Sequence, residues 1–377
     1  MSNNSLHVFL TGDYCPIGPI ERLCAEHDWN GLFGDVLPVL LDKDISIVNL
    51  ECPLTDKARP ISKTGPNLIA PASHIETLNA MGADVAALAN NHILDQGAQG
   101  CLDTIETCLA NGIATVGAGA NNAAATTPLI LEQNGLRLAV INVAENEWST
   151  TWGDTPGAAP LDPVKNARII RQAAEKTDAV LVIVHGGHEL YSLPSPRMVR
   201  LYRFFVEMGA AAVIGHHTHV VGPWEVYRGA PIYYSLGNFV FPWTNKTLAW
   251  RRGMLVRLTF RRGEPVDHEH IHIEQNESGP LIRLLSDKEN RDAEVQLEAL
   301  NDILSDDSRL HERWERWCKQ RSRSAIAGIL GLNRWQRALY KRRLWKPDRR
   351  RLQRLLNIIR CEAHRDVLQH SIEMENK

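Results

Sequence analysis

The sequence of 377 residues lacks the signatures of several protein classes. Its seven cysteines include no CxxC pair, so neither a disulfide framework nor a four-cysteine zinc site is indicated. No apolar run reaches the roughly 20 residues that a membrane-spanning helix needs, and the N-terminal stretch MSNNSLHVFLTGDY has no basic segment followed by a long apolar one. We therefore expect a cytoplasmic protein.

Motifs of nucleophilic hydrolases and of nucleotide-binding enzymes are also missing. There is no GxSxG motif, and the Gly-rich segment GAGANNAAATTP lacks the spacing of a Walker loop or a dinucleotide fingerprint, so we assign it to a turn. The composition itself is ordinary, with 44% hydrophobic and 23% charged residues. These values are typical of soluble globular domains with a real core.

Between residues 6 and about 260, short β-branched runs alternate with helical patterns, which indicates βα units. One connection differs, because only Asn134 and Gly135 separate two strand patterns and predict a hairpin with a type I′ turn. An antiparallel portion beside parallel units predicts a mixed sheet, or a two-sheet sandwich with flanking helices.

The C-terminal part has a different character, because strand signals vanish after about residue 280 and two long helical patterns follow. Residues 313–360 contain sixteen Lys or Arg residues and two acidic residues. We predict a first domain over residues 1–284 and a basic helical extension over residues 285–377. The extension is either a solvated helical bundle or a surface for anionic lipid or polymer, with nucleic acid the least favoured partner.

Polar side chains follow six predicted core strands at the point where each strand ends. They are Asp13, Asn49 with Glu51, the segment Asn90, Asn91 and His92, His185 with His188, the histidines His216, His217 and His219, and Asn238. Each has an ordinary alternative as a turn residue, a helix cap or a hydrogen-bonded core histidine. Ligands of open α/β sheets collect at the carboxyl ends of the strands, and the joint occurrence there indicates a site.

The HxH pair His217 and His219 is the strongest single element of this pattern. Alternate residues of an extended segment project to the same side and can chelate an ion. Carboxylate, amide and imidazole donors together suit Mn²⁺, Fe²⁺ or Zn²⁺ better than Ca²⁺. Coordination also keeps clustered imidazoles neutral. We interpret His216 as a hydrogen-bonding histidine and Lys63 as a solvated loop residue, with contact to an anionic substrate as the alternative for Lys63.

Seven motifs in a fixed order resemble a known family. They are GDYCPIG (12–18), VNLECPLT (48–55), ALANNHILDQG (87–97), GIATVGAG (112–119), HGGHEL (185–190), GHHTHVVGP (215–223) and YSLGNFVF (234–241). The chain resembles the CapA-type proteins of poly-γ-glutamate capsule synthesis, which are similar to the calcineurin-like metallophosphoesterases. The resemblance covers residues 6 to about 260. It implies a four-layer α/β/β/α sandwich with a two-metal centre.

The resemblance also implies a role for individual residues. The implied metal ligands are Asp13, Glu51, Asn91, His185, His217 and His219. Glu51 would bridge the two ions, and His92 would be the catalytic histidine that protonates the leaving oxygen. Asp95 would hold the His92 imidazole in one tautomer, with a helix cap as the alternative. The segment Asp13-Tyr14-Cys15 replaces the DxH of the phosphoesterases, so one ion loses an imidazole ligand.

Two functions stay open on this basis. The first is a hydrolase with two divalent ions that acts on a phosphoester, or on a bond in an anionic polymer, through a metal-bound hydroxide. The second is a non-catalytic component that binds the polymer or assembles a synthesis complex. The retained ligands Asn91, His185, His217 and His219 favour the first, because a decayed site would lose them. The missing imidazole at the first motif and the extra helices favour the second. The sequence also lacks the N-terminal anchor common in capsule versions. Its basic C-terminal helices lead us to expect a cytoplasmic protein at the periphery of the inner face of the membrane.

Overall fold

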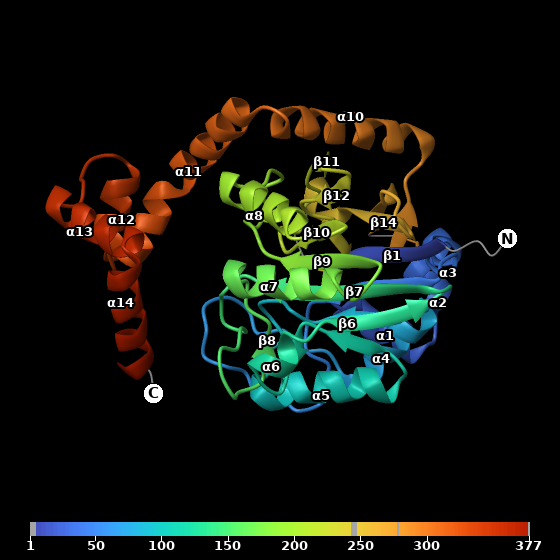
Figure 1. Ribbon diagram of the computed structural model, residues 1–377. Coiled ribbons are helices and arrows are strands. Elements are labelled where there is room, and N and C mark those ends of the chain that lie inside the picture. The colour runs from blue at the N-terminus through green and yellow to red at the C-terminus, as the bar shows by residue number, and fades with distance from the viewer. Residues whose placement is uncertain (1–4, 243–246, 277–278, 376–377) are drawn as a thin grey trace. The chain divides into compact units, whose positions relative to one another are not determined.

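A computed structural model describes residues 5–242, 247–276 and 279–375. The chain divides into two compact units, one that ends at His311 and one that begins at Glu312. The first unit holds two large β-sheets with helices on their outer faces (Figure 1). The predicted α/β sandwich with a helical C-terminal extension is confirmed.

The first large sheet has eight strands. They are β1 (Ser5–Tyr14), β2 (Ile45–Leu50), β3 (Val85–Ala87), β4 (Ala114–Val116), β13 (Asn238–Val240), β14 (Arg252–Arg261), β15 (Asp267–Gln275) and β16 (Ile282–Leu284). Their order is β16-β15-β14-β1-β2-β3-β4, with β13 paired to the end of β1. The strands β1 to β4 are parallel, whereas β14 to β16 are antiparallel to their neighbours.

The second large sheet has six strands. They are β6 (Leu129–Gln133), β7 (Leu136–Ala144), β9 (Ala179–His185), β10 (Ala212–His216), β11 (Trp224–Tyr227) and β12 (Ala230–Tyr233), in the order β11-β12-β10-β9-β7-β6. Only the edge strands β6 and β11 are antiparallel to their neighbours. Asn134 and Gly135 between β6 and β7 have φ values of 54° and 76°, so the predicted hairpin is confirmed. A small sheet pairs β5 (Ala118–Gly119) with β8 (Gly157–Ala158).

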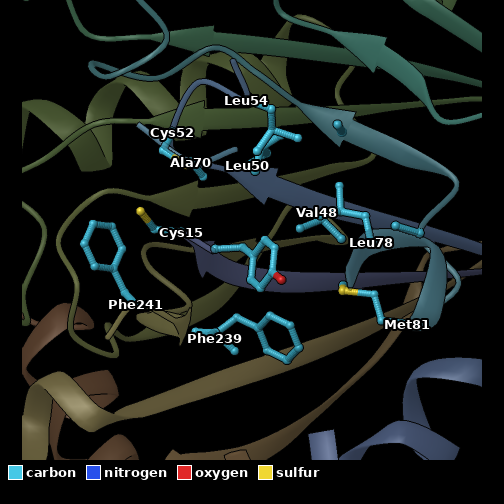
Figure 2. Close-up of a cluster of buried hydrophobic side chains, with 14 of the residues drawn as sticks. Cys15, Val48, Leu50, Cys52, Leu54, Ala70, Leu78, Met81, Phe239 and Phe241 are labelled. Atoms are coloured by element: carbon cyan, nitrogen blue, oxygen red, sulfur yellow. The ribbon is translucent and has the colours of Figure 1, made fainter. Parts of the chain in front are cut away.

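Alternation of side chains along the strands builds the layers. On β1, Val8 and Leu10 pack between the two sheets, whereas Phe9 joins the core under the helices outside the first sheet. Val48 and Leu50 of β2 belong to the same outer core (Figure 2). The outer helices of the first sheet are α1 (Pro19–Ala25), α2 (Trp29–Phe33), α3 (Leu37–Leu41), α4 (Ile75–Ala80) and α5 (Gly97–Ala110), with the short 3₁₀ helices η1 (Gly34–Val36) and η2 (Ala72–His74).

The outer face of the second sheet is covered by α7 (Pro163–Ala174) and α8 (Pro196–Glu207), and two short helices, α6 (Asn122–Ala125) and α9 (Leu248–Arg251), lie in connections. The helix α10 (Asp287–Leu304) follows the last strand and starts at a capping box of Ser286 and Glu289. Its Leu297 packs in the core between the sheets, and Ile303 packs with α8 and the second sheet. The first compact unit therefore extends beyond the boundary expected at residue 284.

The second unit is helical. Its helices are α11 (Asp307–Ile329), which begins in the first unit, α12 (Arg334–Lys341), α13 (Arg349–Arg360) and α14 (Glu362–Glu375). Ala327, Leu330 and Leu332 form a small core, against which Leu352 and Leu355 of α13 pack. None of the helices in the described ranges is both long and apolar enough to cross a bilayer.

Candidate metal centre

The ends of strands from both large sheets converge on one buried cluster. Asp13 lies near the end of β1, and Glu51 directly follows β2. His185 is the last residue of β9 in the second sheet, and His217 and His219 follow β10. All five side chains are buried. The packing of the two sheets thus brings together residues that are up to 206 positions apart in the sequence, Asp13 and His219.

The cluster consists of two groups of three potential ligands that share Glu51. One group is Asp13, Glu51 and His219, and the other is Glu51, His185 and His217. In the first, His219 Nδ1 lies 3.2 Å from Asp13 Oδ2, and His219 Nε2 lies 3.7 Å from Glu51 Oε1. In the second, His185 Nε2 lies 3.5 Å from the same Glu51 oxygen and 3.1 Å from His217 Nδ1. A carboxylate shared by two ligand groups is the arrangement expected for a pair of ions.

The Glu51 carboxylate is buried without compensation. Neither of its oxygens has a hydrogen-bond partner among the described residues. Burial and the charge of Asp13 raise the pKa of Glu51 well above its usual value. Burial alone would raise the pKa of Asp13, but the hydrogen bond to His219 and the charge of that ring outweigh burial, so the pKa is lowered. Because orphaned buried acceptors are costly, the residues present fit a divalent cation at Glu51.

Three carboxamides surround the same cluster. The Asn91 Oδ1 atom lies 3.1 Å from His185 Nε2, which places Asn91 beside the second ligand group. Asn49 donates from Nδ2 to Asp13 Oδ1 over 2.8 Å, and Asn238 Oδ1 lies 3.0 Å from His219 Nδ1. Amide groups of this kind orient ligands without adding charge.

Burial favours the neutral form of three histidines in and beside the cluster. Burial, reinforced by the nearby His217, lowers the pKa of His185 well below its usual value. Burial and His219 lower the pKa of His217 to about 4. The pKa of His216 is also lowered by burial, and its Nε2 lies 2.9 Å from the carbonyl oxygen of Thr11. Neutral imidazole is the form that binds metals, and His216 makes the hydrogen bond expected of it.

The HxH pair reaches the cluster by a different backbone path from the expected one. The strand β10 ends at His216, and His217 and His219 have φ values of 89° and 58°. The expectation of an extended segment was therefore wrong, because left-handed residues turn the chain so that both rings converge. The His217 backbone N–H donates to Asp13 over 3.2 Å. Left-handed backbone at non-glycine residues is costly and concentrates at functional sites.

Asp95 joins His92 to a buried lysine. Its Oδ2 lies 2.7 Å from His92 Nδ1 and accepts from the Leu68 backbone N–H over 2.6 Å. The other oxygen pairs with Lys63, whose side chain is only 2% exposed. Lys63 is therefore not the solvated loop residue that the sequence favoured. The N-cap of α5 is Gln96, so Asp95 does not cap the helix, and its carboxylate lies beside His92 instead.

Glu147 is a candidate that sequence reasoning missed. Its Oε2 accepts from Asn91 Nδ2 over 3.5 Å, and its Oε1 lies 3.7 Å from His217 Nε2. Burial raises the pKa of this carboxyl. A signal was present, since Glu147 closely follows β7, and the other candidate ligands also follow core strands.

Residues 7–243 match the family described as "Bacterial capsule synthesis protein PGA_cap". The chain belongs to this family. It is 31% identical over 249 residues to the "PGA biosynthesis protein CapA" of Bacillus subtilis (strain 168). This match covers 64% of this chain and 66% of the relative. It is 30% identical over 253 residues to the "Capsule biosynthesis protein CapA" of Bacillus anthracis, a match that covers 64% of this chain and 62% of the relative. Each match thus spans slightly less than two thirds of the relative's length.

Solved structures give more distant similarities. A 5′-nucleotidase precursor from Thermus thermophilus has a TM-score of 0.45 and 13% identity, with 78% of this chain and 58% of that chain covered. A hypothetical protein from the same organism has a TM-score of 0.44 and 19% identity, with 71% of this chain and 98% of that chain covered. The CapA-type resemblance predicted from the seven motifs is confirmed by the family match.

Proposed function

We propose that this PGA_cap protein is a metal-dependent hydrolase of capsule or related surface-polymer synthesis, acting on a phosphoester or on a bond in an anionic polymer. The observation that carries the proposal is the buried Glu51 carboxylate, which has no hydrogen-bond partner among the described residues and is shared by two ligand groups. Family membership supports the biological setting, since the relatives are named for PGA and capsule biosynthesis.

Each ligand group would hold one ion. Asp13 and His219 would bind the first ion. His185, His217 and the neighbouring Asn91 would bind the second, and Glu51 would contact both. Mixed carboxylate and imidazole donors suit Mn²⁺, Fe²⁺ or Zn²⁺. When bound, such a pair would polarise a phosphoryl or carbonyl oxygen and lower the pKa of bound water to about 7.

The chain's own proton donor would be His92. Its Nδ1 is engaged by Asp95, which leaves Nε2 for transferring a proton to the leaving oxygen. Lys63 lies 3.3 Å from His92 Nδ1 and balances the charge of Asp95 in the buried site. Lys63 and Asp95 are thus positioning residues that fix the ring of His92.

The test is a chromogenic phosphodiester assay with Mn²⁺, combined with elemental analysis of the purified protein. We expect bound metal in the wild type, and its loss together with turnover in His217→Ala and Asn91→Ala. His92→Ala should keep its metal and lose about 10²- to 10⁴-fold in turnover, the usual contribution of a general acid.

The matched control is His216→Asn, a change at a buried histidine that belongs to neither ligand group. We expect this variant to retain both metal and turnover. Wild-type protein that contains no divalent metal and shows no turnover with any added divalent ion would contradict the hydrolase. Polyglutamate binding by such protein would then support a non-catalytic polymer-binding component.

We also propose that the basic helices from Glu312 onward bind the surface of an anionic membrane. Residues 313–360 carry sixteen basic and two acidic residues. Trp335 and Leu344 are 79% and 71% exposed, although other apolar residues of this unit form its small core. A soluble polyanion needs charge alone, whereas a lipid interface also takes apolar side chains.

Cosedimentation of the full chain with vesicles tests this proposal. We expect binding to phosphatidylglycerol vesicles that weakens with salt, and no binding to phosphatidylcholine vesicles. The double variant Trp335→Ser and Leu344→Ser should bind less while its charge is unchanged. Equal binding by the double variant and the wild type would contradict an interfacial role and leave a purely electrostatic polymer site.

A further inference from the structure

A second group of histidines lies on β15, outside the centre around Glu51. His268, His270 and His272 occupy alternate positions of this strand, so their side chains project from the same face. The helix α10 lies against that face and contributes Glu294. His270 Nε2 and His272 Nε2 lie 3.0 Å and 3.1 Å from one atom, Glu294 Oε1.

The geometry of these three side chains is that of a ligand set. Ligand atoms of His270, His272 and Glu294 all lie within 4.8 Å of one another. The His270 and His272 side chains are 14% and 4% exposed, and Glu294 is 38% exposed. Two ring nitrogens that point to the same carboxylate oxygen leave a position between the three groups where a cation would meet all of them.

The surroundings of the cluster complete the arrangement. The Tyr233 hydroxyl lies 3.4 Å from His270 Nδ1 and 2.8 Å from His268 Nδ1, so it contacts the ring nitrogen of His270 that faces away from Glu294. Such outer contacts fix the orientation of metal-binding histidines. A cavity of about 100 Å³, lined in part by His272 and Gln296, lies beside the cluster and is large enough to hold water.

We propose that His270, His272 and Glu294 form a separate binding site for a single divalent cation of the zinc class, which ties α10 to the edge of the sandwich. Two imidazoles, one carboxylate and a water make up a set that Zn²⁺ accepts. The site shares no residue with the groups around Glu51 and does not depend on the proposed hydrolase activity. Its effect is structural, because α10 contributes Leu297 and Ile303 to two cores of the first unit.

The experiment removes the first centre before measuring the second. The full chain carrying His185→Ala and His219→Ala, which takes one ligand from each group around Glu51, is titrated with Zn²⁺ in equilibrium dialysis. We expect about one Zn²⁺ per chain in this background. Adding Glu294→Gln or His272→Asn should weaken Zn²⁺ binding at least about tenfold. Glu269→Gln is the matched control on the opposite face of β15, where Glu269 pairs with Arg257, and should bind as the background does.

A second measurement separates metal binding from the hydrogen bonds already present. Hydrogen exchange of α10 should slow on addition of Zn²⁺ in the background and in Glu269→Gln, and should not respond in Glu294→Gln. Circular dichroism confirms that each variant is folded. A background that binds no Zn²⁺, or a folded Glu294→Gln variant that binds it as tightly as the background, would show that the cluster is only a hydrogen-bond network.

Discussion

Glu51 and Asp95 are two fully buried carboxylates of the first unit with opposite surroundings. Asp95 is paired with Lys63 and lies in hydrogen-bond contact with His92 and the Leu68 backbone N–H. Glu51 has no hydrogen-bond partner among the described residues, and its histidine neighbours stay 3.5 Å and 3.7 Å away.

The two carboxylates therefore differ in whether the protein itself supplies a partner for the buried charge. A buried charge requires a partner, because removing it from water costs several kcal/mol. The protein itself supplies the partner at Asp95. At Glu51 no described residue supplies a hydrogen-bond partner, and the proposed cation would compensate the charge, so the two carboxylates should respond to neutral substitutions with opposite signs.

The largest effect is expected at Asp95. Asp95→Ala leaves the Lys63 ammonium buried without its carboxylate, which should lower the free energy of unfolding by about 3–5 kcal/mol. Urea denaturation followed by circular dichroism measures this change. The double variant Lys63→Met and Asp95→Leu should recover much of the loss, because it removes both charges.

The control for this prediction is an ion pair on the surface. Arg137 and Glu132 lie 2.9 Å apart with side chains 51% and 67% exposed, and Glu132→Ala should change the free energy of unfolding by less than about 1 kcal/mol. If Asp95→Ala costs no more than Glu132→Ala, the buried pair does not support the fold as proposed.

The sequence was sufficient to predict the fold class and most of the residues that gather at the centre. Apolar strands and helical periods indicated two-sheet βα architecture. The polar residues at strand ends, including Asp13 and His185, meet because parallel strands end at one edge of each sheet and the two sheets pack together. The seven motifs added the family. This part was predictable because it depends on local pattern and on a general rule of sheet topology.

The remaining contacts depend on long-range packing that no local pattern encodes. Lys63 lies in an irregular segment with the composition of a surface loop, and only the fold shows that it is buried against Asp95. The strand β15 was missed because its sequence DHEHIHIEQ places histidines where apolar residues would mark a strand. Without that strand, the histidine group opposite Glu294 could not be foreseen.

The next largest effect is expected from adding a cation that compensates Glu51. With Mn²⁺ at about 100 times its dissociation constant, the free energy of unfolding should rise by about 2.7 kcal/mol, and Glu51→Ala should abolish the response. Thermal unfolding with and without Mn²⁺ measures it. Both proteins carry Glu294→Gln, so that the separate site of His270 and His272 does not contribute to the response. An equal response in Glu51→Ala would place the stabilising ion elsewhere.

The smallest effect is expected from Glu51→Gln, which should stabilise the metal-free protein, whereas Asp95→Ala should destabilise it. The gain at pH 7 in the presence of a chelator should be on the order of 1 kcal/mol, since a buried charge is replaced by a neutral amide of the same shape. Chemical denaturation of both proteins across pH measures it, with the exposed Glu132→Gln as the control.

The pH dependence of that gain follows from the raised pKa of Glu51. Between the ordinary glutamate pKa of 4.5 and the higher value in the folded chain, the folded state binds more protons than the unfolded state. The Glu51 contribution to stability is therefore lost as the pH rises through this interval, and the glutamine variant does not share that loss. The advantage of Glu51→Gln should vanish below pH 4.5 and grow above it. A glutamine variant that is less stable than the wild type at pH 7 without metal would mean that the protein already compensates this carboxylate, and the contrast with Asp95 would fail.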